Sequence, residues 1–175
     1  MVIEFANVSV DSKNYELKFE PNEIDLELDD TSISAETVLN CDAVREGDVV
    51  REGDVVVIRG NISSSVDSLC ARCLGKVETV IGIEFVDRFV EPADDVSADI
   101  RLATNELDVG YVFDGKIDLK EIVREQIILA HPEQVYCSDG CKGLCPKCGS
   151  NRNLIDCKCI EDEIDPRWLA LKNLK

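Results

Sequence analysis

Apolar and polar residues alternate near the start of the chain and again in two longer runs at its middle. Tyr15, Leu17 and Phe19 are separated by charged residues, which is the period of a half-buried strand. Residues 54–69 and 76–90 are rich in β-branched side chains, and the connection between them, CARCLG at residues 70–75, carries two cysteines and a glycine. Two such runs around a short connection predict a β-hairpin with the cysteines at its tip.

A helical period follows at residues 118–130. Asp118 is suited to cap the free N–H groups of the first turn, and Glu121, three residues later, would complete a capping box. Pro132 prevents the helix from continuing past His131. The apolar positions recur at helical spacing and form one stripe, made of Leu119, Ile122, Val123, Ile127 and Ala130.

The remaining segments carry weaker signals. The hexapeptide REGDVV occurs twice in tandem, at residues 45–50 and 51–56; two copies do not make a solenoid, and we expect them to lengthen the entry to a strand. An acidic, turn-rich stretch at residues 91–115 predicts a surface loop. Asp165 followed by Pro166 predicts the start of a short terminal helix.

These patterns together predict an α+β fold. We expect a mostly antiparallel β-sheet with the helix packed on it, followed by a cysteine-rich, zinc-binding C-terminal segment. The predicted division is a body at residues 1–132 that includes the Cys-tipped hairpin, and a zinc-binding segment at residues 133–175 that includes the short terminal helix. Residues 137–160 hold too few apolar side chains to form a core, so bound metal is the expected source of their stability.

The charge of the chain is unevenly distributed. The formal net charge is −17, with 12 Lys and Arg against 30 Asp and Glu in residues 1–136, and 7 against 6 in residues 137–175. A body this acidic repels bare nucleic-acid phosphates. Its charge suits a basic protein partner, although an acidic surface also serves solubility alone.

Nine cysteines in this chain require an explanation. The first residues lack the positive charge and the long apolar run of an export signal, and no apolar run is long enough to span a bilayer. We therefore expect a cytoplasmic protein with no membrane partner. Because the cytoplasm keeps thiols reduced, metal binding is favoured over a disulfide framework.

Eight of the cysteines have spacings that are typical of metal ligands. In a C-x2-C pair, such as those in CARCLG and in CPKCG at residues 145–149, the two intervening residues let both sulfurs face one metal ion. The glycine after such a pair lets the backbone fold back tightly; in CARCLG it stands one position later, at Gly75. The candidate ligands are Cys70, Cys73, Cys137, Cys141, Cys145, Cys148, Cys157 and Cys159.

These eight cysteines predict two sites of four thiolates, with about two Zn²⁺ ions. The preferred partition places Cys145, Cys148, Cys157 and Cys159 in one site, and Cys70, Cys73, Cys137 and Cys141 in the other. An alternative groups Cys137, Cys141, Cys145 and Cys148, and leaves Cys157 and Cys159 to join the hairpin cysteines. The spacing by itself does not decide between these partitions.

Other chemistries fit the pattern less well. An iron–sulfur cluster also takes four thiolates and is the less favoured alternative. A redox C-x2-C pair favours a strand-to-helix setting, whereas strand patterns flank Cys70 and Cys73. A catalytic zinc keeps an open position and usually has histidine ligands, but the chain has one histidine, His131. With no phosphate loop or catalytic triad in the sequence, we expect a non-enzymatic protein with no small-molecule substrate. Cys41 is expected to be a buried, apolar side chain.

Three segments, in this order, resemble one known family. CARCL at residues 70–74, IDLKEIVREQIILAHP at residues 117–132, and CSDGCKGLCPKCGSNRNL…CKC…DPRWLAL at residues 137–171 resemble the YceD family, the large ribosomal RNA subunit accumulation proteins. One departure is SNRNL at residues 150–154, where the family more often has a compact x-N-L-N after the CG.

The resemblance implies a cytosolic factor in the synthesis, processing or stability of large-subunit ribosomal RNA. The leading hypothesis is a ribosome-assembly factor whose acidic body binds a basic ribosomal protein or a pre-ribosomal particle. The rival hypothesis is a direct RNA-binding zinc module, for which stacking aromatic residues are nearly absent in the C-terminal segment. Its phosphate contacts would be Lys142, Lys147, Arg152, Lys158 and Arg167.

Overall fold

The structure is a computed structural model that describes residues 1–48, 53–92 and 109–159. The predicted terminal helix and most of the predicted loop at residues 91–115 lie outside these ranges. Within them, the elements in chain order are β1 (Val2–Glu4), the 3-10 turn η1 (Phe5–Asn7), β2 (Lys13–Phe19), β3 (Ser32–Ile33), β4 (Thr37–Asp48), β5 (Gly53–Leu69), β6 (Lys76–Val90), β7 (Gly110–Tyr111), β8 (Lys116–Asp118) and α1 (Leu119–Ala130).

Most of these strands form one sheet. Its order is β2-β4-β5-β6-β7, and β3 pairs with β5 beyond the start of β4. The β2–β4, β3–β5, β4–β5 and β5–β6 pairs are antiparallel, and β7 lies parallel to the end of β6. β1 and β8 form a separate two-stranded antiparallel sheet. The prediction of a mostly antiparallel sheet with one helix is therefore confirmed for the described residues.

The hairpin of β5 and β6 is the longest strand pairing in the described part of the chain. The two strands pair without a break from Val56 opposite Phe89 to Leu69 opposite Lys76. β-branched residues fill both strands because they pack well on a pleated surface. The predicted hairpin is confirmed, with residues 70–75 at its tip. The described parts of the two REGDVV copies, residues 45–48 and 53–56, lie at the end of β4 and the start of β5, where they pair from Arg45 opposite Val56 to Asp48 opposite Gly53.

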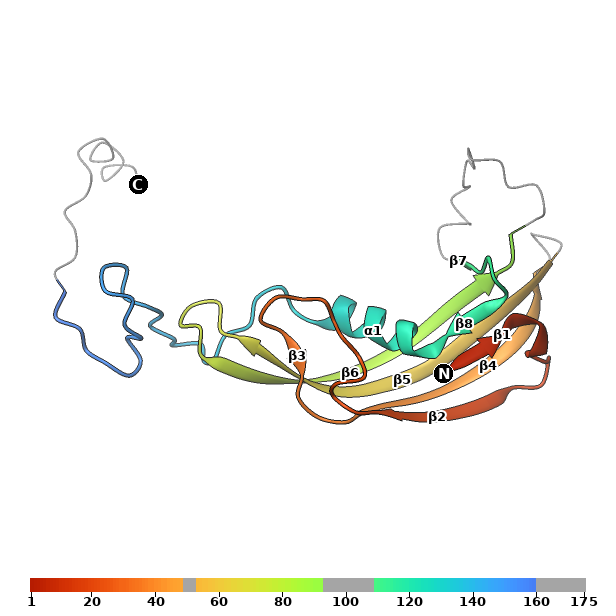
Figure 1. Ribbon diagram of the computed structural model, residues 1–175, viewed down its shortest axis with the longest axis horizontal. Coiled ribbons are helices and arrows are strands. Elements are labelled where there is room, and N and C mark those ends of the chain that lie inside the picture. The colour runs from red at the N-terminus through yellow and green to blue at the C-terminus, as the bar shows by residue number, and fades with distance from the viewer. Residues whose placement is uncertain (49–52, 93–108, 160–175) are drawn as a thin grey trace, which may run out of the picture.

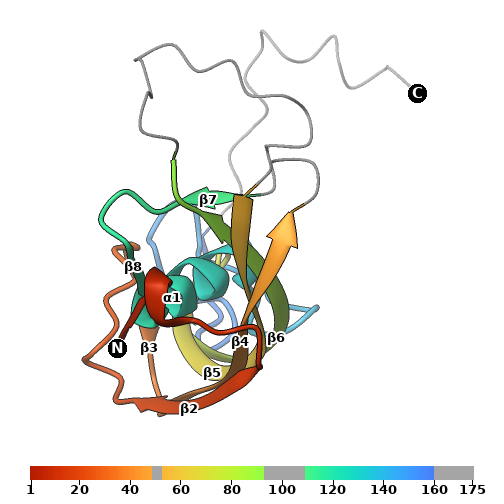
Figure 2. The same ribbon diagram turned by 90° about the vertical axis from the view of Figure 1, so that its right-hand side faces the viewer.

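The six-stranded sheet is strongly curved, and α1 lies in its concave face (Figures 1 and 2). The helix begins where Asp118 accepts a hydrogen bond from the Lys120 N–H at 3.0 Å, as the sequence predicts. The predicted capping box is wrong, because the Glu121 carboxylate pairs instead with Arg124, 2.9 Å away and one turn along the helix. At the other end, the His131 N–H bonds to the Ile127 carbonyl and the helix stops before Pro132.

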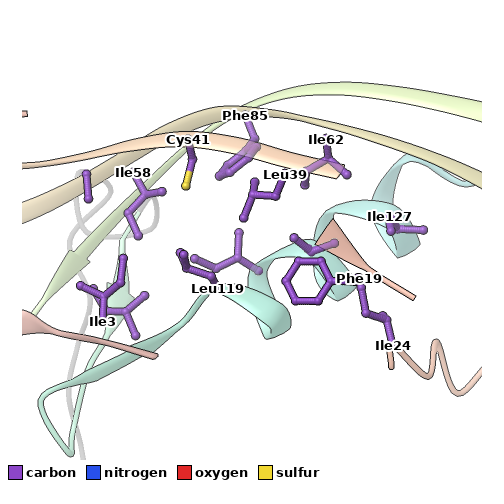
Figure 3. Close-up of a cluster of buried hydrophobic side chains, with 14 of the residues drawn as sticks. Ile3, Phe19, Ile24, Leu39, Cys41, Ile58, Ile62, Phe85, Leu119 and Ile127 are labelled. Carbon is purple, nitrogen blue, oxygen red and sulfur yellow. The ribbon is translucent and has the colours of Figure 1, made fainter. Parts of the chain in front are cut away.

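The core fills the space between the helix and the concave face of the sheet (Figure 3). The predicted apolar stripe of α1 supplies Leu119, Ile122, Val123 and Ile127, which are buried, while Ala130 is exposed. In β2, Phe19 is buried, and Tyr15 and Leu17 are half-buried and pack against the same core. Cys41 packs there too, at 1% exposure, as expected of an apolar side chain.

Candidate metal centre

The first cysteine pair lies in the turn that joins β5 to β6. The Cys70 N–H donates to the Gly75 carbonyl at 2.8 Å, and the Leu74 N–H donates to the Cys70 carbonyl at 2.9 Å. Leu74 has a φ of 56°, in the left-handed region that side chains with a Cβ adopt at a cost. The chain therefore folds back at Leu74 and not at Gly75, the residue to which the sequence analysis attributed this role.

The second pair, Cys145 and Cys148, has the same backbone arrangement. The Cys145 N–H donates to the Ser150 carbonyl at 2.8 Å, and the Gly149 N–H donates to the Cys145 carbonyl at 2.9 Å. Gly149 has a φ of 70° and occupies the position equivalent to Leu74. The two C-x2-C turns are thus two copies of one local structure, in which both sulfurs are held on the same side of the turn.

The structure brings the eight sulfurs together in two groups of four, and within each group all sulfurs lie within 4.8 Å of one another. In the first group, Cys70 Sγ is 3.9 Å from Cys141 Sγ, and Cys73 Sγ is 3.6 Å from Cys137 Sγ. The grouping is that of the preferred partition and not of the alternative. Its members are Cys70, Cys73, Cys137 and Cys141 in the hairpin group, and Cys145, Cys148, Cys157 and Cys159 in the tail group.

Backbone contacts hold the tail, residues 133–159, against the hairpin tip (Figure 1). The Ala71 N–H donates to the Val135 carbonyl at 2.8 Å, and the Leu144 N–H donates to the Arg72 carbonyl at 3.1 Å. The Arg72 guanidinium donates to the carbonyls of Asp139 and Cys141, and lies 4.6 Å from the centre of the Tyr136 ring. Arg72 thus secures the segment that carries Cys137 and Cys141, a role that its place inside a C-x2-C pair does not reveal.

Hydrogen bonds to sulfur favour two thiolates in the hairpin group. The Cys137 N–H lies 3.4 Å from Cys70 Sγ, and this bond is the largest cause that lowers the Cys70 pKa to about 6. The Asn153 side-chain amide lies 3.3 Å from Cys141 Sγ and is the main cause that lowers the pKa of that thiol. Cys137 instead bonds to the neighbouring sulfurs of Cys141 and Cys73, which raises its pKa to about 12.

The tail group divides in the same way. Backbone N–H groups of Cys148 and Lys147 lower the Cys145 pKa, and the Ser150 hydroxyl and N–H lower the Cys148 pKa to about 6. The pKa of Cys157 is raised mainly by its bond to Cys145, and the pKa of Cys159 rises to about 12 mainly through Cys148. Each group therefore contains two thiols with a lowered pKa, and a bound cation would favour ionisation of the remaining thiols.

The sulfur geometry fits a tetrahedral metal ion. Four sulfurs at the usual Zn–S distance of about 2.3 Å lie about 3.8 Å from one another in a regular tetrahedron. The sulfur–sulfur distances of 3.6 and 3.9 Å in the hairpin group bracket this value. Neither four-sulfur group includes a histidine or a carboxylate. A closed set of four thiolates suits structural zinc, whereas catalytic zinc keeps a position open.

Asn153 connects the two groups and was missed by the sequence analysis. Its side-chain amide bonds to Cys141 Sγ, and its carbonyl oxygen accepts the Lys142 N–H at 2.9 Å. It lies in the SNRNL stretch, between the two cysteine pairs of the tail group. The departure of this stretch from the family pattern marks the loop but does not single out Asn153. His131 and Cys41 belong to neither group.

Comparison with known proteins places the chain in a family. The family profile described as "Large ribosomal RNA subunit accumulation protein YceD" matches residues 58–175, which is more than half of the chain. The chain belongs to the YceD family. The matched range includes the whole of β6 and α1 and all eight clustered cysteines.

Relatives in the curated collection of proteins support this membership. An uncharacterized protein of Mycobacterium tuberculosis is 32% identical over 123 residues, which cover 66% of this chain and 54% of that protein. YlbN of Bacillus subtilis, also uncharacterized, is 33% identical over 107 residues, or 60% of this chain and 58% of YlbN. A chloroplast protein of Arabidopsis thaliana, large ribosomal RNA subunit accumulation protein YCED homolog 1, is 35% identical over 60 residues, or 34% of this chain and 19% of that protein.

This YceD chain spans about half the length of the mycobacterial relatives that it matches. No solved structure matches it. Among the described residues, no helix has both the length and the apolar character needed to cross a membrane.

Proposed function

We propose that this YceD protein is a non-enzymatic, zinc-binding factor in the biogenesis of the large ribosomal subunit. It acts in the cytoplasm, where reducing conditions keep its eight clustered thiols free to bind two Zn²⁺ ions. The observation that carries the proposal is the pair of four-sulfur groups within the segment that matches the family. The family description and the name of the Arabidopsis relative supply the link to large-subunit RNA.

The zinc ions serve structure in this proposal. The hairpin group joins the β5–β6 tip to the chain that follows α1, and the tail group folds residues 145–159 on themselves. Apart from these bonds, the tail offers little apolar packing, since Leu154 is 82% exposed and Ile155 is 57% exposed. Coordination energy replaces a hydrophobic core there, as in other small metal-bound segments.

The partner is proposed to be a basic ribosomal protein or a pre-ribosomal particle, because the net charge of −17 favours a cationic surface. The direct RNA-binding alternative has less support. The aromatic residues near its basic side chains are Tyr136 and Trp168. Tyr136 lies under the Arg72 guanidinium, and Trp168 lies outside the described residues. Stacking on bases needs an aromatic face that is free.

The test combines cellular RNA with partner capture. Cells that lack the protein should contain less large-subunit RNA relative to small-subunit RNA, and the wild-type gene should restore the ratio. Tagged protein should capture large-subunit proteins that remain bound after nuclease treatment. If the RNA ratio is unchanged, the biogenesis role is wrong. If every association disappears with nuclease, and naked RNA binds with a steep salt dependence, the RNA-binding alternative is correct instead.

A further inference from the structure

Strand β6 has a second edge that is open along most of its length. β5 covers one edge from Lys76 to Phe89, whereas β7 pairs with the other edge only at Phe89 and Val90. In the part of the chain that the structure describes, no backbone group bonds to this second edge between Lys76 and Arg88. β6 and β2 lie at opposite sides of the curved sheet (Figure 2). Unpaired N–H and C=O groups along an edge form a template for another extended chain.

The register shows which residues offer their backbone groups. The Val90 carbonyl accepts the Val112 N–H at 2.9 Å, on the side of β6 where β7 lies. Because the β5–β6 pairing has no bulge, every second residue before Val90 points its N–H and C=O toward that same side. The residues that face the open edge are therefore Glu78, Val80, Gly82, Glu84, Val86 and Arg88.

Among the features by which sheets prevent pairing, this edge has charged side chains, Glu78, Glu84 and Arg88, but no proline. β6 contains no proline, and its single lysine is Lys76, at the hairpin tip. Val80 is 75% exposed and Val86 is 51% exposed, so apolar side chains flank the open backbone. The carboxylates of Glu78 and Glu84 at the open edge oppose pairing with a second acidic copy of the chain, and they favour a strand that carries positive charge.

A groove lies beside the open edge, where β6 meets α1. Its volume is about 490 Å³, and Val86, Asp87, Glu125, Gln126 and Leu129 are among the residues that line it. Burial raises the pKa of Asp87, and burial together with the charges of Glu121 and Asp87 raises the pKa of Glu125. The Gln126 amide donates to the Asp87 carboxylate, at 3.2 Å to its nearer oxygen. Leu129 leaves an apolar side chain 78% exposed at this groove.

Carboxylates that lie close to one another gain from a cation placed between them, and Asp87 is also half-buried. A lysine or arginine has an apolar stem that would lie along Leu129 while its charged end reaches Asp87 and Glu125. Backbone pairing supplies affinity in strand addition, and side-chain pockets supply specificity. The open edge and the groove together meet both requirements for a basic, extended chain.

We propose that the open edge of β6 binds a basic, extended segment of a partner protein, which adds to the sheet as a strand and places a lysine or arginine side chain beside Asp87 and Glu125. This inference rests on the function proposed above, because it names the surface through which a basic ribosomal partner is recognised. The bound segment alternates basic and small apolar residues, because successive side chains of a strand point to opposite faces of the sheet. Its basic residues lie on the face of Asp87, and its apolar residues lie on the opposite face, beside Val80 and Val86.

The test uses the zinc-loaded full chain and a synthetic heptapeptide of alternating lysine and valine, with titration calorimetry as the readout. An alternating glutamate–valine peptide is the control probe, and it should not bind. Val86→Pro should weaken lysine–valine binding at least tenfold, because it removes an N–H from the open edge without removing a bond to β5. Val86→Ala, the matched control, should change binding less than threefold. Circular dichroism and zinc content should be equal in both variants.

A second pair of variants tests the charges. Asp87→Asn with Glu125→Gln should weaken lysine–valine binding about tenfold, whereas Asp11→Asn with Glu16→Gln, which removes the same charge elsewhere, should change it less than twofold. The proposal is overturned if Val86→Pro binds the peptide like wild type, if wild type does not bind it, or if a single-stranded RNA binds the edge in its place. If the wild-type chain does not bind the peptide but forms a dimer, and Val86→Pro makes it monomeric, then the edge pairs with a second copy of the chain.

The peptide experiment and the measurement of the RNA ratio test the edge and the proposed function separately. If Val86→Pro loses the peptide but still captures large-subunit proteins after nuclease treatment, the inference is wrong and the proposed function stands. If the RNA ratio of the deletion strain is normal while the peptide results hold, the proposed function is wrong and the edge serves another basic partner.

Discussion

At Gly60 the strands β4 and β5 approach too closely for any side chain. A Cβ at this position would lie 2.4 Å from the Asn40 carbonyl oxygen and 2.6 Å from Cys41 Cβ. Both neighbours belong to the paired strand, so neither moves without disturbing the sheet. Gly82, on β6, has no atom within 4 Å of the same constructed position. The two glycines therefore form a matched pair for mutation.

Gly60→Ala should lower the free energy of unfolding by about 3 kcal/mol, at the upper end of the cost of overpacking, because the new methyl group collides with backbone. Gly82→Ala should change it by less than about 0.5 kcal/mol, as is usual for surface substitutions. Urea titration of both variants measures the difference. Equal stabilities for the two variants would contradict the close approach of β4 and β5.

Cys41 provides a second test at the scale of one residue. Burial raises the pKa of this thiol to about 11, from an ordinary value near 9. The unfolded chain therefore releases the proton at lower pH than the folded chain, so stability is present below about pH 9 and is lost as the pH rises toward 11. Cys41→Ala has no thiol and should not show this loss. The stability gap between wild type and Cys41→Ala should narrow by about 2 to 3 kcal/mol between pH 8 and pH 11.

Urea titrations of both proteins at each pH measure the free energy of unfolding. The loss of stability from the smaller alanine side chain is the same at every pH, so it does not affect the pH dependence of the difference. A gap that stays constant from pH 8 to pH 11 would mean that the Cys41 thiol ionises as easily in the folded chain as in the unfolded one. Its assignment to the core would then be wrong.

At the scale of elements, the two C-x2-C turns belong to different groups, and single mutations should separate them. Cys73→Ser removes a ligand from the hairpin group and should increase hydrogen exchange at the hairpin tip and at residues 137–141. Residues 157–159 should keep their protection. Cys145→Ser removes a ligand from the tail group and should expose residues 144–159 first. In both variants three thiolates remain, which bind zinc more weakly than four.

Hydrogen exchange resolved by peptide segment makes this measurement. If Cys73→Ser exposes residues 157–159 and spares residues 137–141, the cysteines are partitioned as in the alternative grouping. If neither variant changes the exchange of the tail, the cysteines are not structural ligands.

The elements that the sequence predicted are those set by local pattern. The β5–β6 hairpin and α1 follow from periodicity, from Asp118 and from Pro132, all of which act within a few residues. The β1–β8 pair and the parallel β7 were not predicted, because they join segments far apart in the chain and have two or three residues a strand. The capping box was wrong because Arg124, one turn further on, takes the Glu121 carboxylate.

The candidate site divides in the same way. The tail group lies within 15 consecutive residues, from Cys145 to Cys159, so spacing predicts it directly. The hairpin group depends on α1, which runs back along the hairpin over about 18 Å and returns the chain toward the tip that carries Cys70. The number of cysteines suggested that the hairpin tip and residues 137–141 share a site. The position of α1 in the fold shows how the chain brings them together. Arg72 and Asn153 act through tertiary contacts, which the spacing of residues along the sequence does not predict.

At the scale of the whole molecule, metal removal should separate the tail from the body. The body has its own core between α1 and the sheet, whereas we expect the tail to depend on metal bound by its cysteine sulfurs. A chelator should therefore increase hydrogen exchange at residues 137–159 while β4, β5 and α1 stay protected. The tail group should lose zinc first, because Cys148 and Cys159 are exposed, whereas Cys70, Cys73 and Cys141 are buried. Loss of protection in β5 on chelation would mean that the predicted body at residues 1–132 does not fold alone.

We propose that this protein binds two zinc ions, each through four cysteine sulfurs. Zinc-edge X-ray absorption of the purified protein, combined with elemental analysis, identifies both the metal and its neighbours. We expect about two zinc ions per chain, and only sulfur neighbours at about 2.3 Å. Iron with visible absorption, nitrogen or oxygen neighbours at the zinc, or a stoichiometry near zero would contradict it.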